Sequence, residues 1–305
     1  MTHVLIHGLR RSGTTILWET LRSDRSLRCY DEPFHPRFTA GQRDNHKGTW
    51  TELAEDVSKL LVQPVPIHPL DELDCGSSQA QIDWLAALMA ARDRVVIDLV
   101  RCWNRMPTLV AGSDDVINVQ ILRDPANWAA AQLVPTAPPS IKRRLTNLYR
   151  RETFFSRKGY YDGYQYQQII EAAINRDHPL FRFSRPTVDE LRRAPAYIRL
   201  LAFWWGANTT LARSLMAANQ TYVAVSLSEF STNPKQQIAR IAAAAGWSNT
   251  HVDVGAVRVA RESFGTTSPL WKSAAQWLAI PVDIVTEGGG TAARMVDAFR
   301  RAEQY

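Results

Sequence analysis

The stretch that decides the fold is HVLIHGLRRSGTT, at residues 3–15. Its apolar run, Val4–Ile6, is too short for a helix and predicts a buried strand. Gly8 and Gly13 then bracket a loop with the G-x-x-x-x-G spacing of a phosphate-binding loop, and a helix is predicted from Thr14 onward. The N–H groups of such a loop and the positive end of the following helix dipole bind an oxyanion. This stretch therefore predicts a strand–loop–helix unit that holds a phosphate.

The two residues after Gly13 decide which phosphate chemistry is expected. A nucleotide-hydrolysing loop carries lysine and then serine or threonine there, and the lysine reaches the β- and γ-phosphates. This chain has Thr14 and Thr15 instead, and the nearest cation, Arg11, lies inside the loop. The loop is therefore expected to hold a phosphate ester differently from the way ATP is held.

Length and composition bound the class of protein. The chain has 305 residues, is 45% hydrophobic and carries a net charge of +6, which suits a globular core and an anionic ligand. Its three cysteines lie far apart, which favours a reducing compartment over a disulfide framework or a zinc site. Because the sequence shows no leader and no apolar run of membrane-spanning length, we expect a soluble, cytoplasmic protein.

Apolar runs and helical patterns alternate along the chain. Strands are predicted at 26–30, 94–100, 115–122 and 221–226, and helices at 14–22, 51–61, 79–92, from about 126, and at 193–219, 233–245 and 292–302. This order predicts a three-layer α/β fold of the P-loop type, with a mostly parallel central sheet flanked by helices. We expect one domain over 1–305, with a helical, basic and aromatic insertion at about 135–195.

Three polar clusters follow predicted strands: Gly8–Thr15, Asp31-Glu32 and Arg123-Asp124. Since ligands bind at the carboxyl ends of parallel strands, these clusters are expected to converge on one edge of the sheet. Together they resemble the sulfotransferases that use 3′-phosphoadenosine 5′-phosphosulfate (PAPS), through Arg11-Ser12-Gly13-Thr14-Thr15, Glu32-Pro33 and Leu122-Arg123-Asp124-Pro125. The carbohydrate and tyrosyl-protein branches are the most similar in these motifs. Segments 221–245 and 263–272 are also similar to later parts of that family, so the resemblance spans about residues 3–275.

The resemblance implies transfer of a sulfonate from PAPS, as co-substrate and with no metal, to a hydroxyl or amine. The acceptor would be a small molecule, a natural product or a carbohydrate. The resemblance also implies a binding set for the 5′-phosphate and the sulfonate: Arg10, Arg11, Ser12, Gly13, Thr14 and Thr15. Arg123 would hold the 3′-phosphate, and Thr267 and Lys272, with Thr266, would close over the nucleotide. The family's serine partner of this arginine falls at Ala131, where Asn127 and Gln132 offer polar groups at a different spacing.

Glu32 is the candidate general base, because sulfonyl transfer to a hydroxyl requires that its proton be removed. If the strand continues through both residues, Asp31 and Glu32 point in opposite directions, so only one of them would face the site. His35 is a second candidate, as base or as substrate contact. Arg11 would neutralise the sulfonate and so contribute to catalysis. Arg101 and Arg105 are candidates for stabilising the leaving nucleotide, and Asp98 lies near the place where a lysine was expected.

Plainer interpretations and two other functions stay open. Glu32 could be a helix cap or an ion-pair partner, Arg123 could pair with Asp124, and His35 could be an ordinary loop histidine. The chain could be a P-loop kinase of small molecules, although it lacks the lysine and a convincing Walker-B aspartate. The basic and aromatic stretch 142–166 could line an acceptor pocket or bind RNA, but an amphipathic helix pair explains it better, and no nucleic-acid partner is expected.

Overall fold

The fold is described from a computed structural model, which covers residues 2–38, 49–60, 62–132, 145, 166–248, 250–255, 257, 269–286 and 290–305. The chain divides into two compact units, Met1–Leu122 with Leu211–Ala260, and Arg123–Thr210 with Arg261–Tyr305. Helix α9 (Ala196–Ala217) belongs to both units.

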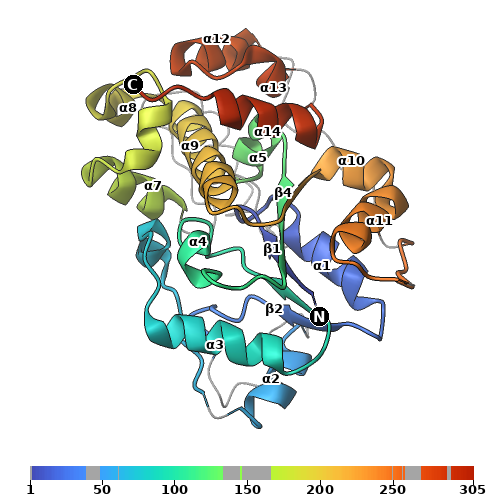
Figure 1. Cartoon of the computed structure of the whole chain (residues 1–305). Coiled ribbons are helices and arrows are strands. Elements are labelled where there is room, and N and C mark those ends of the chain that lie inside the picture. Colours follow the sequence, from blue (N-terminus) through green and yellow to red (C-terminus); the bar gives the residue numbers. More distant parts are fainter. Residues whose placement is uncertain are drawn as a thin grey trace. The chain divides into compact units, whose positions relative to one another are not determined.

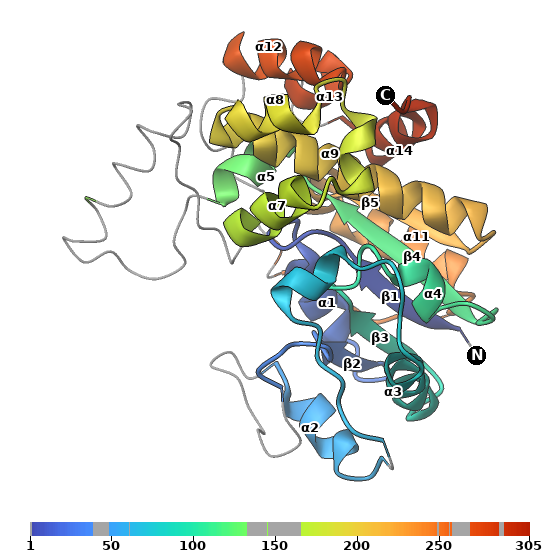
Figure 2. The same ribbon diagram turned by 90° about the vertical axis from the view of Figure 1, so that its left-hand side faces the viewer.

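The first unit is built on a five-stranded sheet in the order β2-β3-β1-β4-β5, with all neighbouring strands parallel (Figures 1 and 2). The strands are β1 (His3–His7), β2 (Arg28–Asp31), β3 (Val95–Asp98), β4 (Val116–Leu122) and β5 (Tyr222–Ser226). Because the strands are parallel, all their carboxyl ends lie at one edge, where ligands bind in such sheets. The α/β fold with a parallel central sheet and flanking helices that the sequence predicts is confirmed.

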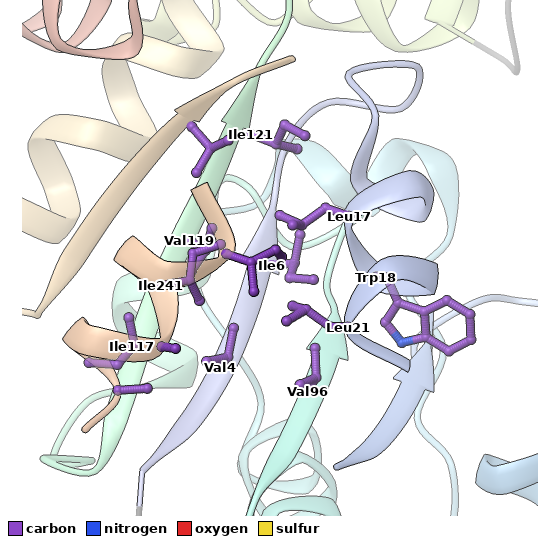
Figure 3. Packing of buried hydrophobic residues seen from close by; sticks show 14 of the residues in the cluster. Val4, Ile6, Leu17, Trp18, Leu21, Val96, Ile117, Val119, Ile121 and Ile241 are labelled. Carbon is purple, nitrogen blue, oxygen red and sulfur yellow. The ribbon is translucent and has the colours of Figure 1, made fainter. Parts of the chain in front are cut away.

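The helices of this unit connect the strands. They are α1 (Thr14–Arg22), α2 (Thr51–Val57), the 3-10 helix η1 (Pro69–Leu73), α3 (Gln79–Ala90), α4 (Met106–Leu109), α10 (Leu227–Thr232) and α11 (Pro234–Ala244). Two of them, α1 and α11, cover the same face of the sheet, where Leu17, Leu21 and Ile241 meet Ile6 and Val119 in one buried cluster (Figure 3). This packing fixes α1 behind the loop that follows β1.

The other face of the sheet carries a buried polar layer that the sequence analysis did not identify. The ring of His7 lies 3.0 Å from Oδ1 of Asn118, and the Tyr222 hydroxyl donates to Gln120 at 2.6 Å. Burial lowers the pKa of His7 to about 3, and the bond to Asn118 opposes this shift, so the ring is neutral at physiological pH. Each of these strand residues satisfies a polar group of a neighbouring strand.

The described part of the second unit is helical (Figure 2): α5 (Pro125–Ala131), α7 (Tyr166–Asn175), η2 (Pro179–Phe183), α8 (Val188–Arg193), α12 (Pro269–Leu278), α13 (Val282–Thr286) and α14 (Ala292–Arg301), with the first part of α9. Aromatic side chains hold it together. The rings of Trp204 and Trp205 lie 5.9 and 5.3 Å from that of Phe299, and Trp128 contacts Tyr166 at 5.3 Å.

About half of the predicted insertion, at 135–144 and 146–165, lies outside the described residues. The prediction of one domain over 1–305 stays a prediction. The helical spacing of residues 14–22 predicts that Ile16, Leu17 and Leu21 point inward. The prediction is wrong for Ile16, which is 40% exposed, whereas Trp18 is buried together with Leu17 and Leu21. Trp18 shares the buried stripe with Leu21, three positions on, while Ile16 lies outside that stripe.

Candidate functional site

The loop between β1 and α1 has the backbone of an anion-binding nest. Arg11 and Gly13 both have positive φ, 73° and 105°, and the Ser12 amide donates to Leu9 at 2.9 Å. A Cβ on Gly13 would lie 2.6 Å from Leu227, and one on Gly8 would lie 2.9 Å from the Ile121 carbonyl oxygen. Both glycines are therefore required by close packing against neighbouring elements, and Gly13 by its conformation as well. This arrangement turns successive N–H groups toward one point at the start of α1.

Two side chains of the loop region are buried at this point. Within the described part of the chain, the Ser12 hydroxyl oxygen has no hydrogen-bond partner, although the residue is only 1% exposed. Thr14 is buried as well, and its hydroxyl faces Asp98 at the end of β3. An unsatisfied buried hydroxyl inside a nest fits a ligand with phosphate or sulfonate oxygens.

Glu32 follows the last residue of β2 and adopts φ 41°. A left-handed conformation is unfavourable for glutamate, and such strain concentrates at functional sites. The turn is held by the His35 amide, which donates to the Glu32 carbonyl oxygen at 2.9 Å, and by the Trp84 indole, which donates to Pro33 at 3.3 Å. The strand ends before Glu32, so the predicted alternation of Asp31 and Glu32 along a strand does not extend to Glu32.

The two carboxylates differ in their surroundings. Asp31 is buried and accepts a hydrogen bond from the Thr49 hydroxyl at 2.5 Å. The Glu32 side chain is 24% exposed and accepts from Nε of Arg101 at 3.1 Å. Glu32 is therefore the more accessible of the two to an acceptor.

A chain of ion pairs continues from Glu32 into the sheet edge. Nη1 of Arg101 lies 3.1 Å from Glu72, and Nη2 of Arg10 lies 3.3 Å from each oxygen of the same carboxylate. The Glu72 side chain is fully buried. Burial raises the pKa of Glu72, and the two arginines oppose that shift. The structure thus joins Glu32, Arg101 and the loop residue Arg10 through Glu72, which lies in η1 and which no motif in the sequence singled out.

His35 lies close to this group of charges. Its Nδ1 accepts the Arg37 amide at 3.1 Å, and its ring packs edge-on against Trp50 at 5.2 Å. Burial, and then the charge of Arg101, lower the pKa of His35 to about 4, while Glu32 opposes the shift. The ring is therefore neutral near pH 7, and the bond at Nδ1 places its proton on Nε2, which makes Nε2 a donor.

Arg105 serves the structure of the segment that carries Glu72. Its guanidinium donates to the carbonyls of Asp71 and Gly76 and to the side chain of Gln81. The side chain is 5% exposed. These contacts give Arg105 a structural role in holding residues 71–81.

Two other predicted site residues belong to the second unit. Arg123 directly follows β4 and is half-buried, and Asp124 caps α5 by accepting the Asn127 amide at 2.7 Å. Lys272 lies on α12 and is exposed, whereas Thr266 and Thr267 lie outside the described residues.

Residues 131 and 132, at the end of α5, differ in burial. Ala131 is half-buried, and Gln132 is 1% exposed and donates to the Trp128 carbonyl at 3.2 Å. The structure therefore assigns the Gln132 amide group to the end of this helix, and a role for Asn127, Gln132 or Arg123 toward a ligand stays a prediction.

The described residues contain no helix that is long and apolar enough to cross a membrane. They also contain no group of three or more His, Cys, Asp or Glu side chains that could hold a metal ion.

Comparisons with known proteins give only distant likenesses. No family model matches the chain, and no curated protein matches it. Among solved structures, a sulfotransferase from Alicyclobacillus acidocaldarius is similar at 14% identity and a TM-score of 0.46, over 99% of each chain. The sulfotransferase domain of the Synechococcus PCC 7002 olefin synthase is similar at 12% identity and a TM-score of 0.35, over 82% of this chain and 74% of that one. Likenesses at these values carry no weight for the activity or for the role of any residue.

Proposed function

We propose that this protein is a sulfotransferase that moves a sulfonate from PAPS to a hydroxyl or amine of a small-molecule, natural-product or carbohydrate acceptor. The observation that carries the proposal is the pairing of a lysine-free anion nest with a strained, accessible glutamate at the carboxyl ends of β1 and β2. The motif resemblance of residues 11–15, 32–33 and 122–125 supports the same reaction. A cytoplasmic location and a single domain are part of the proposal.

The residues divide the work between binding and proton transfer. The nest amides, Ser12 and Arg11 hold the 5′-phosphate and neutralise the sulfonate, since guanidinium and amide donors strengthen as charge develops on the oxygens. Glu32 takes the acceptor proton while the acceptor oxygen bonds to sulfur and the sulfur–oxygen bond to the 5′-phosphate breaks. Arg123 holds the 3′-phosphate, and Thr267 and Lys272 contact the nucleotide.

His35 fits the role of a substrate contact better than that of the base. With its proton on Nε2, the neutral ring donates a hydrogen bond to an acceptor oxygen. Its pKa of about 4 also makes it a weak proton acceptor at neutral pH. Glu32 therefore remains the proposed base.

One observation favours a second candidate function, a P-loop kinase of small molecules. Asp98 ends an apolar strand beside β1 and faces Thr14, as the magnesium-binding aspartate of P-loop enzymes faces the loop. Burial and then Asp31 and Glu32 raise the pKa of Asp98 well above its usual value, which favours the neutral acid over a metal-binding carboxylate. Together with the absent lysine, this makes the kinase the weaker proposal.

Thermal unfolding in the presence of adenosine 3′,5′-bisphosphate or magnesium-ATP separates the two functions. A ligand at a hundred times its Kd adds about 2.7 kcal/mol to the free energy of unfolding, so the Tm should rise by several degrees with the bisphosphate. Glu32→Gln should keep this shift but lose at least about a hundredfold in kcat for sulfonyl transfer, the usual contribution of a general base.

The matched control is Glu52→Gln, which removes the same charge from a bidentate pair with Arg22 at 2.6 and 2.7 Å. This variant should keep both the shift and the kcat. A Tm shift with magnesium-ATP but not with the bisphosphate would refute the sulfotransferase, and full activity of Glu32→Gln would refute Glu32 as the base.

A further inference from the structure

We propose that Glu72 is a positioning residue, which sets the place of the Glu32 carboxylate through Arg101 and joins it to the loop through Arg10. The proposal rests on the proposed function for the role of Glu32. Glu72 contacts the loop through Arg10 and reaches Glu32 through Arg101, so its effect on the reaction passes through these two arginines.

The geometry gives Arg101 two anchors. Its Nε binds Glu32 and its Nη1 binds Glu72, both at 3.1 Å, so a single planar guanidinium spans the two carboxylates. Because the guanidinium is rigid, fixing one edge of it on the fully buried Glu72 also fixes the edge that holds the partly exposed Glu32. Glu72 is thus the immobile end of this chain of contacts.

The segment that carries Glu72 is itself held in place on both sides. Arg105 donates to the carbonyl of Asp71, and Asn104 donates to the carbonyl of Leu73 at 2.5 Å. Both donors and Arg101 lie in the segment 99–105, between β3 and α4. This segment therefore holds the backbone around Glu72 with two of its side chains and binds the Glu72 carboxylate with a third.

Charge balance explains why this position needs a carboxylate. Arg10 and Arg101 bring two positive charges into a region where each side chain is only 8% exposed, and Glu72 lies between them. Without the negative charge of Glu72, the two buried guanidinium groups would repel each other. Arg101 would then keep its ion pair with Glu32. We expect Arg101 and Glu32 to move as a consequence.

The nest does not depend on Glu72 in the same way. Its shape is set by the packing of Gly8 and Gly13 and by backbone hydrogen bonds, from Ser12 to Leu9 at 2.9 Å and from Leu17 to Gly13 at 3.2 Å. Loss of Glu72 should therefore affect proton removal much more than nucleotide binding.

The test compares Glu72→Gln with Glu52→Gln in the full chain. We expect Glu72→Gln to lower kcat for sulfonyl transfer about a hundredfold, the usual effect of displacing a catalytic group by about 1 Å. The Kd for adenosine 3′,5′-bisphosphate should change less than about threefold, and Glu52→Gln should change neither. Glu72→Asp, which keeps the negative charge, should have a kcat about tenfold higher than that of Glu72→Gln. Unchanged kcat in Glu72→Gln, or an equal loss of kcat and of bisphosphate affinity, would overturn the proposal.

Arg101→Lys keeps the test decisive if Glu72→Gln does not fold. Lysine preserves the buried charge, but its single ammonium group cannot hold both carboxylates as the guanidinium does. It should fold, bind the bisphosphate and lose kcat to a similar extent; wild-type kcat in this variant would count against the proposal.

A readout independent of activity separates this inference from the proposed function. If the wild-type protein binds no bisphosphate, the proposed function fails. Crystal structures of Glu72→Gln, or of Arg101→Lys if that variant alone folds, still decide the positioning role. A displaced Glu32 carboxylate supports the role, and an unmoved one refutes it.

Discussion

At the scale of single residues, three carboxyl groups lie close together beside the nest, those of Asp31, Glu32 and Asp98, and their mutual repulsion favours a neutral form of one of them. Asp98 and Asp31 occupy matching positions on the adjacent strands β3 and β2, and Asp98 is fully buried. Burial is the main cause that raises the pKa of Asp98, followed by the charges of Asp31 and Glu32. The Thr14 hydroxyl and the Val100 amide oppose this shift only in part. A neutral Asp98 reduces the repulsion around Glu32.

This shift predicts a pH-dependent stability. Between the pKa of an unfolded aspartate, about 4, and the raised pKa of Asp98, the folded protein binds a proton that the unfolded chain has lost. The free energy of unfolding should therefore fall by about 1.4 kcal/mol per pH unit in that interval through this group alone. Asp98→Asn removes this pH dependence. In urea unfolding, the free energy of unfolding of the variant relative to wild type should therefore be higher at pH 8 than at pH 5. An equal difference at both pH values would contradict the shift.

The residues that could be predicted from sequence lie at the ends of strands or at the start of a helix. Gly8 and Glu32 directly follow β1 and β2, and Gly13 directly precedes α1, so a single sequence displays their positions. Glu72 could not be found in this way, because its meaning comes from two arginines on other segments. The position of Asp98 at the end of a strand is visible in the sequence, but its raised pKa follows from its burial beside Asp31, which the sequence does not show.

At the scale of elements, α9 and η2 approach each other closely through a glycine. A Cβ on Gly206 would lie inside contact distance of the Leu180 carbonyl oxygen, which is backbone and cannot turn away. The Trp205 indole donates to the Phe183 carbonyl at 2.8 Å and holds the same pair of elements together. Glycine is thus kept in the middle of a long helix despite its low helix propensity.

Gly206→Ala should therefore destabilise the protein although alanine is the better helix former. Overpacking costs about 1–3 kcal/mol, and the contact is with backbone, so it should outweigh the gain of about 1 kcal/mol in helix propensity. Chemical unfolding measures the difference. The control is Gly76→Ala, where no atom lies within 4 Å of the added Cβ and the change should stay within about 0.5 kcal/mol. A stabilised Gly206→Ala would show that η2 does not pack as described.

Elements with strong periodicity were predicted well, and short ones were not. All five strands were expected within two residues of their bounds, and β1 and β3 show the apolar runs typical of buried parallel strands. The one-turn helix α4 and the short helices η1 and α10 were not predicted, because caps and tertiary contacts stabilise them, such as the Ser226 cap of α10. Periodicity has no signal over so few residues.

At the scale of the whole molecule, α9 joins the two units in a single continuous helix. Its residues up to Thr210 belong to one unit and those from Leu211 to the other, and Thr209, Leu211 and Ala212 are almost completely buried. If one unit unfolded alone, the helix would have to end inside this buried stretch. The new end would leave four carbonyl or four N–H groups without helical partners.

This continuity predicts that the chain unfolds in one cooperative transition, as expected of a single domain. Fluorine NMR of protein labelled with 5-fluorotryptophan can follow Trp84 in the first unit and Trp205 in the second, each assigned by substitution with phenylalanine. Their unfolding midpoints in urea should coincide, and adenosine 3′,5′-bisphosphate should raise both by the same amount, because a ligand stabilises every part that unfolds together with its site. Separate midpoints, or a shift confined to Trp84, would show two domains that fold independently on either side of Thr210 and Leu211.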